Sequence, residues 1–404
     1  MTLSTASTRE FPMRVYFGAC GVGLGHVGRC VPVAKTLLKR GDSILISTYS
    51  DACDYVRSEG LPLCVAPPIG FAFRRDGGVD FRRTTAYPGI FSPLIFTRQL
   101  NAELAFMKQY RPDFVVSDSR ASTILAAKLL GLPVITLLNV YRVTIPRERR
   151  FLQLAKIADG GILTLIGKIW SLGEHVLIPD FPPPYTLSVA NLGIPRRRQG
   201  KVELVGPILP VKPDTLPDTR QIREKLDIDG HKMILVSISG SAAEKRLIIP
   251  LLKKLLRKLP TTNQIVMSLG RPNTNGAART DGNLTVLDWL PNRFEYLKAC
   301  DLVISRAGLG TLTEAISYGK PLILIPTPSQ TEQYNNARRA SQLGVATMLD
   351  QRDLNFNSLH STINDVLAGD YFSRVGKVKA AVSGYNAVDT IVSIIHRRRT
   401  RLKA

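Results

Sequence analysis

The pattern of hydrophobic and polar positions repeats one unit along the chain, in which a short apolar run is followed by a turn and a longer amphipathic stretch. We expect the apolar runs to be buried strands at 13–19, 44–48, 61–66, 114–117, 134–138, 175–178, 233–237, 265–269, 284–287, 302–305, 322–325 and 345–349. Helices are expected from 26 to about 40 and over 94–110, 120–130 and 311–318. Because strands joined through helices pair in parallel, the pattern predicts an α/β fold with parallel sheets.

Interruptions of this pattern divide the chain into two domains, as its length of 404 residues allows. Residues 1–12 are rich in Ser and Thr and are expected to form a flexible tail, and residues 13–206 carry the first series of strands and helices. A stretch rich in Pro and Asp, 207–231, predicts the linker. Residues 232–380 are expected to form a second domain of strands and helices, and residues 381–404 a final helix with a basic tail.

The most specific stretch of the sequence is Asp301 to Ala337. A strand at 302–305 leads into a turn that contains Gly308 and Gly310, and a helix is expected from Thr311. The glycines leave backbone N–H groups accessible at the start of this helix, where the helix dipole favours a negative charge. The stretch therefore predicts a binding site for the diphosphate of a nucleotide.

Polar side chains in the same stretch suit the other parts of a nucleotide sugar. Glu314 lies one turn into the helix, where a carboxylate can accept hydrogen bonds from both hydroxyls of a ribose. Glu332 and Gln333 follow the next strand and are candidates for binding sugar hydroxyls. Arg306, just before the glycines, is a candidate cation for stabilising a departing diphosphate.

The order S-R-x-G-x-x-T-x-x-E, then G-x-P, then E-Q-x-x-N-A, resembles the nucleotide-sugar-binding half of GT-B glycosyltransferases. The bacterial peptidoglycan N-acetylglucosaminyltransferase MurG and the UDP-glycosyltransferases of plants and animals are the nearest likenesses. The resemblance implies two Rossmann-like domains with parallel sheets that face a central cleft, with the acceptor bound by the N-terminal half and the donor by the C-terminal half. It also implies that the final helix packs back on the first domain. An ordinary Rossmann-type turn without a sugar ligand is the alternative.

A second glycine-rich loop follows the first strand and ends at His26. His26 stands where the last glycine of a dinucleotide-binding motif would be, and the loop is similar to the G-x-G-G-H loop of MurG. We expect His26 to be the base that deprotonates the acceptor, the alternative being a histidine that only caps the loop. Pro32 departs from a regular helix start and predicts an irregular first turn.

Asp118 directly follows the strand at 114–117. Plant UDP-glycosyltransferases have an aspartate after a strand at a similar distance from the histidine. The resemblance implies that the Asp118 carboxylate orients the His26 imidazole and stabilises its protonated form. Alternatively, Asp118 caps the N-terminus of the helix at 120–130, which is a common role for aspartate.

Two further places in the second domain are candidates for donor binding. Ser239 and Gly240 precede a helix and predict a second phosphate-binding turn, which MurG also carries. Trp289 and Leu290 resemble the opening of the plant donor motif, where the nucleotide base is bound, and the Trp289 ring is suited to stacking on that base. A position in the core is the alternative for Trp289.

The charge of the chain suggests a further partner, since 54 basic and 32 acidic residues give a net charge of +22 at pH 7. Such a charge attracts anionic lipid, nucleic acid or a phosphorylated substrate. We expect an anionic membrane surface to meet the loop 71–93, where arginine pairs alternate with aromatics, the arginine-flanked apolar segment 142–172 and the tail 396–404. A solvated loop and a core-facing helical hairpin are the alternatives for the first two stretches. No nucleic-acid partner is expected, because no nucleic-acid-binding module is present.

The remaining composition favours a cytoplasmic protein that is peripheral on the inner face of the membrane. The five cysteines show neither a C-x-x-C pair nor metal-ligand spacing, which is typical of a reducing compartment. No uninterrupted apolar run is long enough to span a bilayer. Neither a cofactor nor a metal is expected.

The resemblance implies an inverting, metal-independent glycosyltransferase that moves a sugar from a UDP-sugar to a hydroxyl acceptor, with a membrane lipid or a lipid-linked glycan as the expected acceptor. A UDP-sugar 2-epimerase of the same fold is the first alternative. A sugar-nucleotide-binding protein without catalysis is the second.

Overall fold

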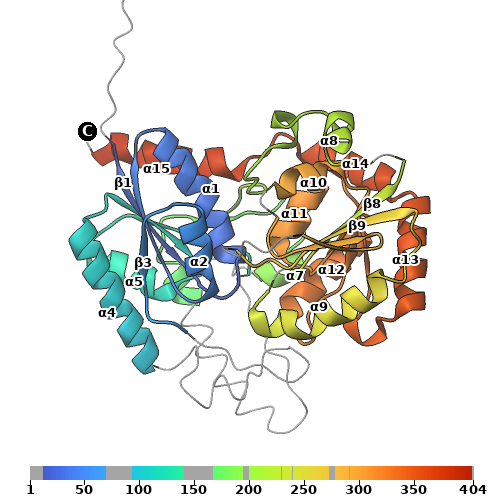
Figure 1. Ribbon diagram of the computed structural model, residues 1–404. Helices are drawn as coiled ribbons and strands as arrows, with labels where there is room; N and C mark the ends of the chain where they lie inside the picture. The colour runs from blue at the N-terminus through green and yellow to red at the C-terminus, as the bar shows by residue number, and fades with distance from the viewer. Residues whose placement is uncertain are drawn as a thin grey trace, which may run out of the picture.

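The computed structural model describes residues 12–69, 93–140, 167–193, 200–228, 230–238, 240–272, 278–290 and 292–402. Two α/β domains lie side by side, the first mainly blue to green and the second mainly yellow to red, while the red helix at the end of the chain lies over the first domain (Figure 1). Several predicted features fall outside the described residues: Ser239, nearly all of the tail 1–12, the loop up to residue 92, the segment 142–166, and the last two residues of the chain.

The first domain is built on a seven-stranded sheet in which all neighbouring strands are parallel. The strand order is β3-β2-β1-β4-β5-β6-β7. Its strands are β1 (Arg14–Ala19), β2 (Ser43–Thr48), β3 (Leu63–Val65), β4 (Phe114–Asp118), β5 (Val134–Leu137), β6 (Val176–Ile178) and β7 (Val202–Leu204).

The second domain also has a seven-stranded sheet, in the order β10-β11-β9-β8-β12-β13-β14, with antiparallel pairing only between β10 and β11 among the described pairs. Its strands are β8 (Lys232–Ser237), β9 (Asn263–Ser268), β10 (Arg279–Asp281), β11 (Leu284–Leu287), β12 (Leu302–Ser305), β13 (Leu322–Leu324) and β14 (Ala346–Met348). The predicted α/β fold with two mainly parallel sheets is confirmed. The edge strand β10 was not predicted, because its three residues are polar and exposed and carry no apolar pattern.

Helices cover both faces of each sheet (Figure 1). In the first domain and the linker they are α1 (Gly25–Lys39), α2 (Asp51–Ser58), α4 (Pro93–Tyr110), α5 (Ala121–Leu129), α7 (Val189–Leu192), the 3-10 helix η2 (Pro213–Thr215) and α8 (Thr219–Lys225). In the second domain they are α9 (Ala242–Leu256), α10 (Arg293–Ala299), α11 (Leu309–Ser317), α12 (Thr331–Gln342), the 3-10 helix η3 (Gln351–Asp353), α13 (Phe356–Ala368) and α14 (Tyr371–Val382), before α15 (Ala387–Leu402) ends the chain. None of the helices in the described parts of the chain is long and apolar enough to cross a membrane.

Alternation along the strands divides each domain into two apolar cores, one on either face of its sheet. On β1, Val15 and Phe17 belong to the core under α1, whereas Tyr16 between them belongs to the core under α4 and α5. Helix α1 is continuous from Gly25 and runs through Pro32, so the predicted irregular first turn is not found. Pro32 is itself buried among core residues, and this packing holds the helix together around the missing N–H.

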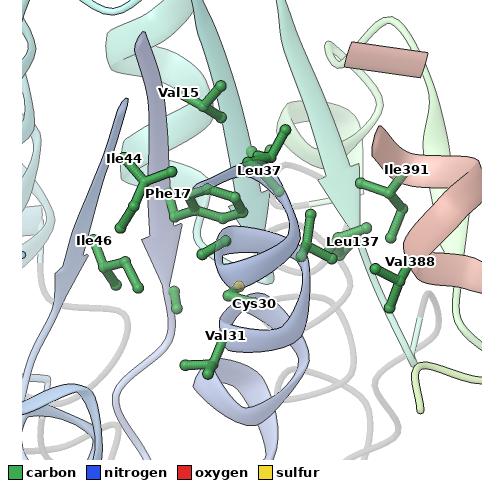
Figure 2. Close-up of a cluster of buried hydrophobic side chains, with 14 of the residues drawn as sticks. Val15, Phe17, Cys30, Val31, Leu37, Ile44, Ile46, Leu137, Val388 and Ile391 are labelled. Carbon is green, nitrogen blue, oxygen red and sulfur yellow. The ribbon is translucent and has the colours of Figure 1, made fainter. Parts of the chain in front are cut away.

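The last helix belongs to the core of the first domain rather than to the domain that precedes it in sequence. Val388 and Ile391 of α15 lie beside Leu37 of α1 and Leu137 of β5 in one apolar cluster, as Figure 2 shows. The His396 side chain at the far end of α15 lies 2.8 Å from the Asp42 carboxylate. Helix α15 therefore ties the two ends of the chain into one domain.

A short segment after β6 departs from the predicted domain boundary at 206. Phe181 and Leu187 are fully buried in the core of the second domain, although they precede the last strand of the first. Asp180 anchors the segment, since its carboxylate accepts hydrogen bonds from the backbone N–H groups of Phe181, Leu187 and Ser188 and from the Ser188 hydroxyl. The chain thus contacts the second domain before it returns to complete the first sheet.

Candidate active site

A cleft of about 620 Å³ lies between the two domains, and both domains line it. Its walls come from the loops and helix starts at the C-terminal ends of the strands, including Gly23 after β1, Asn139 after β5 and Gly308 after β12. The backbones of Gly23 and Gly240 approach each other across the cleft, since a Cβ on Gly23 would lie 3.8 Å from the backbone of Gly240. Ligands bind at this edge of parallel sheets because helix N-termini and loops converge there.

His26 and Asp118 meet at the first-domain wall of the cleft. The turn after β1 needs glycine at position 21, because a Cβ there would lie 2.0 Å from the carbonyl oxygen of Tyr49. His26 follows as the second residue of α1, and its Nδ1 lies 2.7 Å from Oδ1 of Asp118. The two residues meet because β1 and β4 are paired with Asp118 opposite Ala19. Asp118 does not cap the following helix, for which Arg120 is the N-cap residue.

Arg29, one turn after His26 on α1, also binds the Asp118 carboxylate. Its Nε donates to Oδ2 at 2.9 Å and its Nη2 to Oδ1 at 2.7 Å, and the Asp118 side chain is fully buried. Burial alone would raise the pKa of the Asp118 carboxyl, but the charges of Arg29 and His26 hold that pKa below its ordinary value. The carboxylate therefore stays ionised and has two partners instead of one.

Glu332 of α12 reaches this cluster from the second domain. Its Oε1 accepts a hydrogen bond of 2.6 Å from Nδ2 of Asn139, and Asn139 in turn lies 3.4 Å from Nη2 of Arg29. Burial raises the pKa of Glu332, while the nearby His26 and Arg29 act in the opposite direction. Glu332, the predicted sugar-binding residue, therefore lies in the second domain and faces the predicted base, His26, in the first.

Gln333, the neighbour of Glu332, lines the cleft and is held by the loop after β13. Its Oε1 accepts a hydrogen bond of 2.8 Å from the backbone N–H of Thr327.

The N-terminus of α11 lies at the second-domain wall of the cleft. Gly308 is its N-cap residue, no side chain caps the helix, and Gly308, Gly310 and Thr311 all line the cleft. The geometry is that of an anion-binding site made from backbone N–H groups and the helix dipole.

The N-terminus of α9 differs from that of α11. Its N-cap residue is Ser241, and Glu244 closes a capping box by accepting a hydrogen bond of 2.6 Å from the backbone N–H of Ser241. Gly240 lines the cleft with φ +117° and leaves space for this carboxylate. A side chain of the protein therefore already occupies the second predicted phosphate-binding turn. Lys245 lines the cleft beside it and donates to the carbonyl oxygen of Gly270 at 2.6 Å.

The remaining donor candidates lie together at the other end of the cleft. Trp289 is half-buried rather than a core residue, and Leu290 next to it is buried. The Trp289 ring packs against Tyr55 of the first domain with ring centroids 5.8 Å apart. Glu314 accepts two hydrogen bonds, of 2.6 and 2.7 Å, from the guanidinium of Arg293. Aromatic rings and a carboxylate at this end suit a nucleoside.

Arg306 is the predicted site residue that the structure does not bring to the cleft. It is buried at 1% exposure, it is not among the cleft-lining residues, and its Nη1 donates to the carbonyl oxygen of Ile325. Burial lowers the pKa of its guanidinium to about 10. The prediction of a direct contact with the diphosphate is therefore not supported, because the side chain is buried and its guanidinium is directed to the backbone of Ile325.

The residues of the site that were not predicted include Arg29, Tyr55, Asn139, Lys245 and Arg293. A signal existed for two of them. Arg29 lies three residues after His26, so both occupy one face of a helix, and Asn139 follows a strand on the ligand edge of the sheet. The others have no such local signal. Tyr55 meets Trp289 only through the packing of the two domains, and Arg293 meets Glu314 and Lys245 meets Gly270 only through the fold of the second domain.

Among the described residues, no group of three or more His, Cys, Asp and Glu side chains is arranged to hold a metal ion. The sequence contains one D-x-D spacing, Asp227 to Asp229, at the end of the linker. Asp227 does not line the cleft, and Asp229 lies outside the described residues.

The fold and the cleft define the class of protein: a GT-B glycosyltransferase, in which two Rossmann-like domains face each other. Residues 234–382 match the glycosyltransferase family 28 C-terminal domain, and residues 13–160 match glycosyl transferase family 1. The two matches cover the two domains separately.

Individual relatives agree with the family matches. An uncharacterized glycosyltransferase of Methanosarcina acetivorans is 27% identical over 83% of this chain and 86% of its own length. The UDP-N-acetylglucosamine–N-acetylmuramyl-(pentapeptide) pyrophosphoryl-undecaprenol N-acetylglucosamine transferase of Desulforudis audaxviator is 25% identical over 95% of this chain and 98% of its own. The spinosyn rhamnosyltransferase SpnG, solved with thymidine diphosphate, shares the fold with a TM-score of 0.66 at 18% identity, covering 95% of this chain and all of its own.

The protein is a glycosyltransferase, and it is similar to enzymes of the family 28, MurG-like kind.

Proposed function

We propose that the protein transfers a sugar from a UDP-sugar to a hydroxyl group of a lipid or lipid-linked acceptor, with inversion at the anomeric carbon. The observation that carries this proposal is the position of the His26–Asp118 pair opposite the uncapped N-terminus of α11 in one cleft. A base on one wall and an anion-binding site on the other suit an in-line displacement between an acceptor and a nucleoside diphosphate.

In this reaction Nε2 of His26 takes the proton of the acceptor hydroxyl while the oxygen attacks the anomeric carbon. The bond from that carbon to the diphosphate oxygen breaks, and the nucleoside diphosphate leaves with the electron pair. Backbone N–H groups at Gly308–Thr311 stabilise the charge that develops on it, and Lys245 adds a cation on the same side of the cleft. These groups stabilise the charge of the leaving diphosphate, and no role in this is assigned to a metal.

The first-domain wall of the cleft includes a group of apolar side chains. These are Ile69, Phe96, Val140 and Trp170. An apolar wall suits the chain of a lipid acceptor. The name of the Desulforudis relative specifies an undecaprenol-linked acceptor, and we propose an acceptor of the same class, reached from the cytoplasmic face of the membrane.

An assay with membrane extract and a panel of radiolabelled UDP- and dTDP-sugars tests the proposal. We expect labelled product in the lipid phase with one of the UDP-sugars, and none with the His26→Ala protein. The dTDP-sugars are included because SpnG was solved with thymidine diphosphate. Conversion of the donor without acceptor would instead indicate the epimerase, and tight nucleotide binding without any turnover would indicate a binding protein.

A further inference from the structure

Arg29 shares the Asp118 carboxylate with His26, and this changes the electrostatics of the proposed base. Nη2 of Arg29 and Nδ1 of His26 lie at the same distance, 2.7 Å, from the same oxygen, Oδ1. Nη2 also lies 3.0 Å from Nδ1 itself. The Arg29 side chain is 9% exposed and that of Asp118 is fully buried, so water screens these charges weakly.

An isolated aspartate beside a histidine would strengthen the base by stabilising the imidazolium. Here the guanidinium binds both carboxylate oxygens and cancels that charge. It also places a positive charge 3.0 Å from Nδ1 of His26. Glu332 of α12, a carboxyl group of opposite charge to Arg29, also lies near the ring.

The same contacts select the tautomer. A guanidinium can only donate, so an Nδ1 that accepted from Arg29 would leave the proton on Nε2 and remove the base from the cleft. The shorter contact, to the charged Asp118 oxygen, requires the proton on Nδ1. Asp118 can accept from both neighbours because each carboxylate oxygen has two lone pairs.

We propose that Arg29 is a positioning residue that keeps His26 neutral, with Nε2 free to accept a proton, by neutralising Asp118. This inference rests on the proposed role of His26 as the base. It assigns to Arg29 no contact with either substrate.

The direct test is an NMR titration of the imidazole of His26 in the full-length protein without substrates. The chain has five histidines, and the spectrum of His26→Gln identifies the resonance. In Arg29→Met, which removes the charge but keeps the length, the midpoint should rise by about one to two pH units, because Asp118 then acts on His26 alone. In Arg29→Lys the midpoint should stay nearer the wild-type value. Arg57→Met, an exposed arginine of the same domain, is the matched control and should show no shift.

A second pair of variants keeps the test decisive if Arg29→Met does not fold. Asp118→Asn alone leaves Arg29 unpaired and should lower the midpoint. In the double variant Arg29→Met, Asp118→Asn both charges are absent, and the midpoint should return to within about half a unit of wild type, because the charges cancel there. A double variant whose midpoint falls by a full unit or more would show that Asp118 is not neutralised in the wild type, and the proposal would be overturned.

Activity separates this inference from the proposed function. If His26 is the base, the acidic limb of the kcat/KM profile of Arg29→Met should move to higher pH together with the NMR midpoint. A shift in the NMR midpoint with an unchanged profile would leave Arg29 as proposed and remove His26 from the chemistry. An unchanged midpoint would overturn the role of Arg29 whatever the activity.

Discussion

Glu314 combines two roles at the scale of a single residue. Both of its oxygens accept a hydrogen bond from Arg293, and its side chain is 11% exposed. Each oxygen keeps a second lone pair, so the carboxylate can still accept hydrogen bonds from a ribose diol while Arg293 holds it in place. The proposed nucleotide site therefore has a charged hydrogen-bond acceptor whose orientation Arg293 fixes.

We predict that UDP binds about ten- to a hundredfold more tightly than dTDP, which lacks the 2′-hydroxyl, because a charge-assisted hydrogen bond contributes about 1.5–3 kcal/mol. Glu314→Ala should narrow this difference in isothermal titration calorimetry. Glu224→Ala, which removes an exposed carboxylate on α8, is the control and should leave both affinities unchanged. Equal affinities in the wild type would mean that Glu314 does not bind the ribose.

His26 is the residue on which turnover is expected to depend. We predict that His26→Ala lowers kcat by roughly 10²–10⁴, the usual effect of removing a positioned general base. UDP affinity and the thermal midpoint should stay close to wild type, because the His26 side chain is 23% exposed and lies on the acceptor wall. Asp118→Asn should impair turnover less.

His175→Ala, at an exposed position of the same domain, provides the control for this measurement. A His26→Ala protein with near wild-type turnover would place the base elsewhere.

At the scale of elements, α15 shows that a helix can stabilise a domain from which it is distant in sequence. Ala387, Val388, Ile391, Val392 and Ile395 are buried in the first domain although α14, just before them, packs on the second. The chain therefore crosses between the domains at its end as well as in the linker. Loosening α15 should destabilise the first domain and leave the second largely intact.

We predict that Ile391→Ala lowers the free energy of unfolding of the first domain by about 2–5 kcal/mol, since Ile391 is fully buried and its truncation leaves a cavity. Urea unfolding followed by tryptophan fluorescence measures this in a Trp289→Phe background. The chain has two tryptophans, and Trp170 then reports on the first-domain core. Ser393→Ala, exposed on the same helix, should change the value by less than about 0.5 kcal/mol. If Ile391→Ala and Ser393→Ala had the same free energy of unfolding, the contact of α15 with the core would contribute little to the stability of the first domain.

At the scale of the whole molecule, the two domains already touch across the cleft at both of its ends. Tyr55 packs on Trp289 at the nucleoside end, and Asn139 bonds Glu332 at the end with the base. Both contacts join residues that face a substrate in the proposed reaction. Binding of donor and acceptor should therefore influence how the domains close over them.

The net charge of +22 also belongs to this scale. We predict that the protein sediments with anionic liposomes at low salt and hardly with neutral ones, because each basic residue near an anionic surface contributes about 1 kcal/mol. High salt should weaken the binding without abolishing it, since salt does not screen apolar contacts.

Replacing Arg147, Arg149 and Arg150 with Ser should reduce the fraction of protein that sediments. These positions lie outside the described residues, so the variant tests the sequence-based expectation directly. If the wild type stayed in the supernatant, a soluble acceptor would be the better explanation.

Local patterns in the sequence were enough to determine the repeating strands and helices, the two domains and some of the residues that line the cleft. Strand, glycine turn and helix follow each other within about ten residues. The residues of Gly308–Glu314 that line the cleft are therefore neighbours in the sequence too, and a local pattern can predict them. A polar edge strand such as β10 escaped prediction because it carries no apolar pattern.

Only the tertiary structure decided which side chains share a partner. The resemblance to UDP-glycosyltransferases implied that Asp118 lies near His26, but the pairing of β1 with β4 and the helical turn to Arg29 made it a group of three. Arg306 lies in the donor motif and yet is buried with its guanidinium on the carbonyl oxygen of Ile325, whereas Tyr55 lies far from that motif and reaches Trp289. The direction of a long side chain depends on the packing of elements that are distant in sequence, and no local pattern records it.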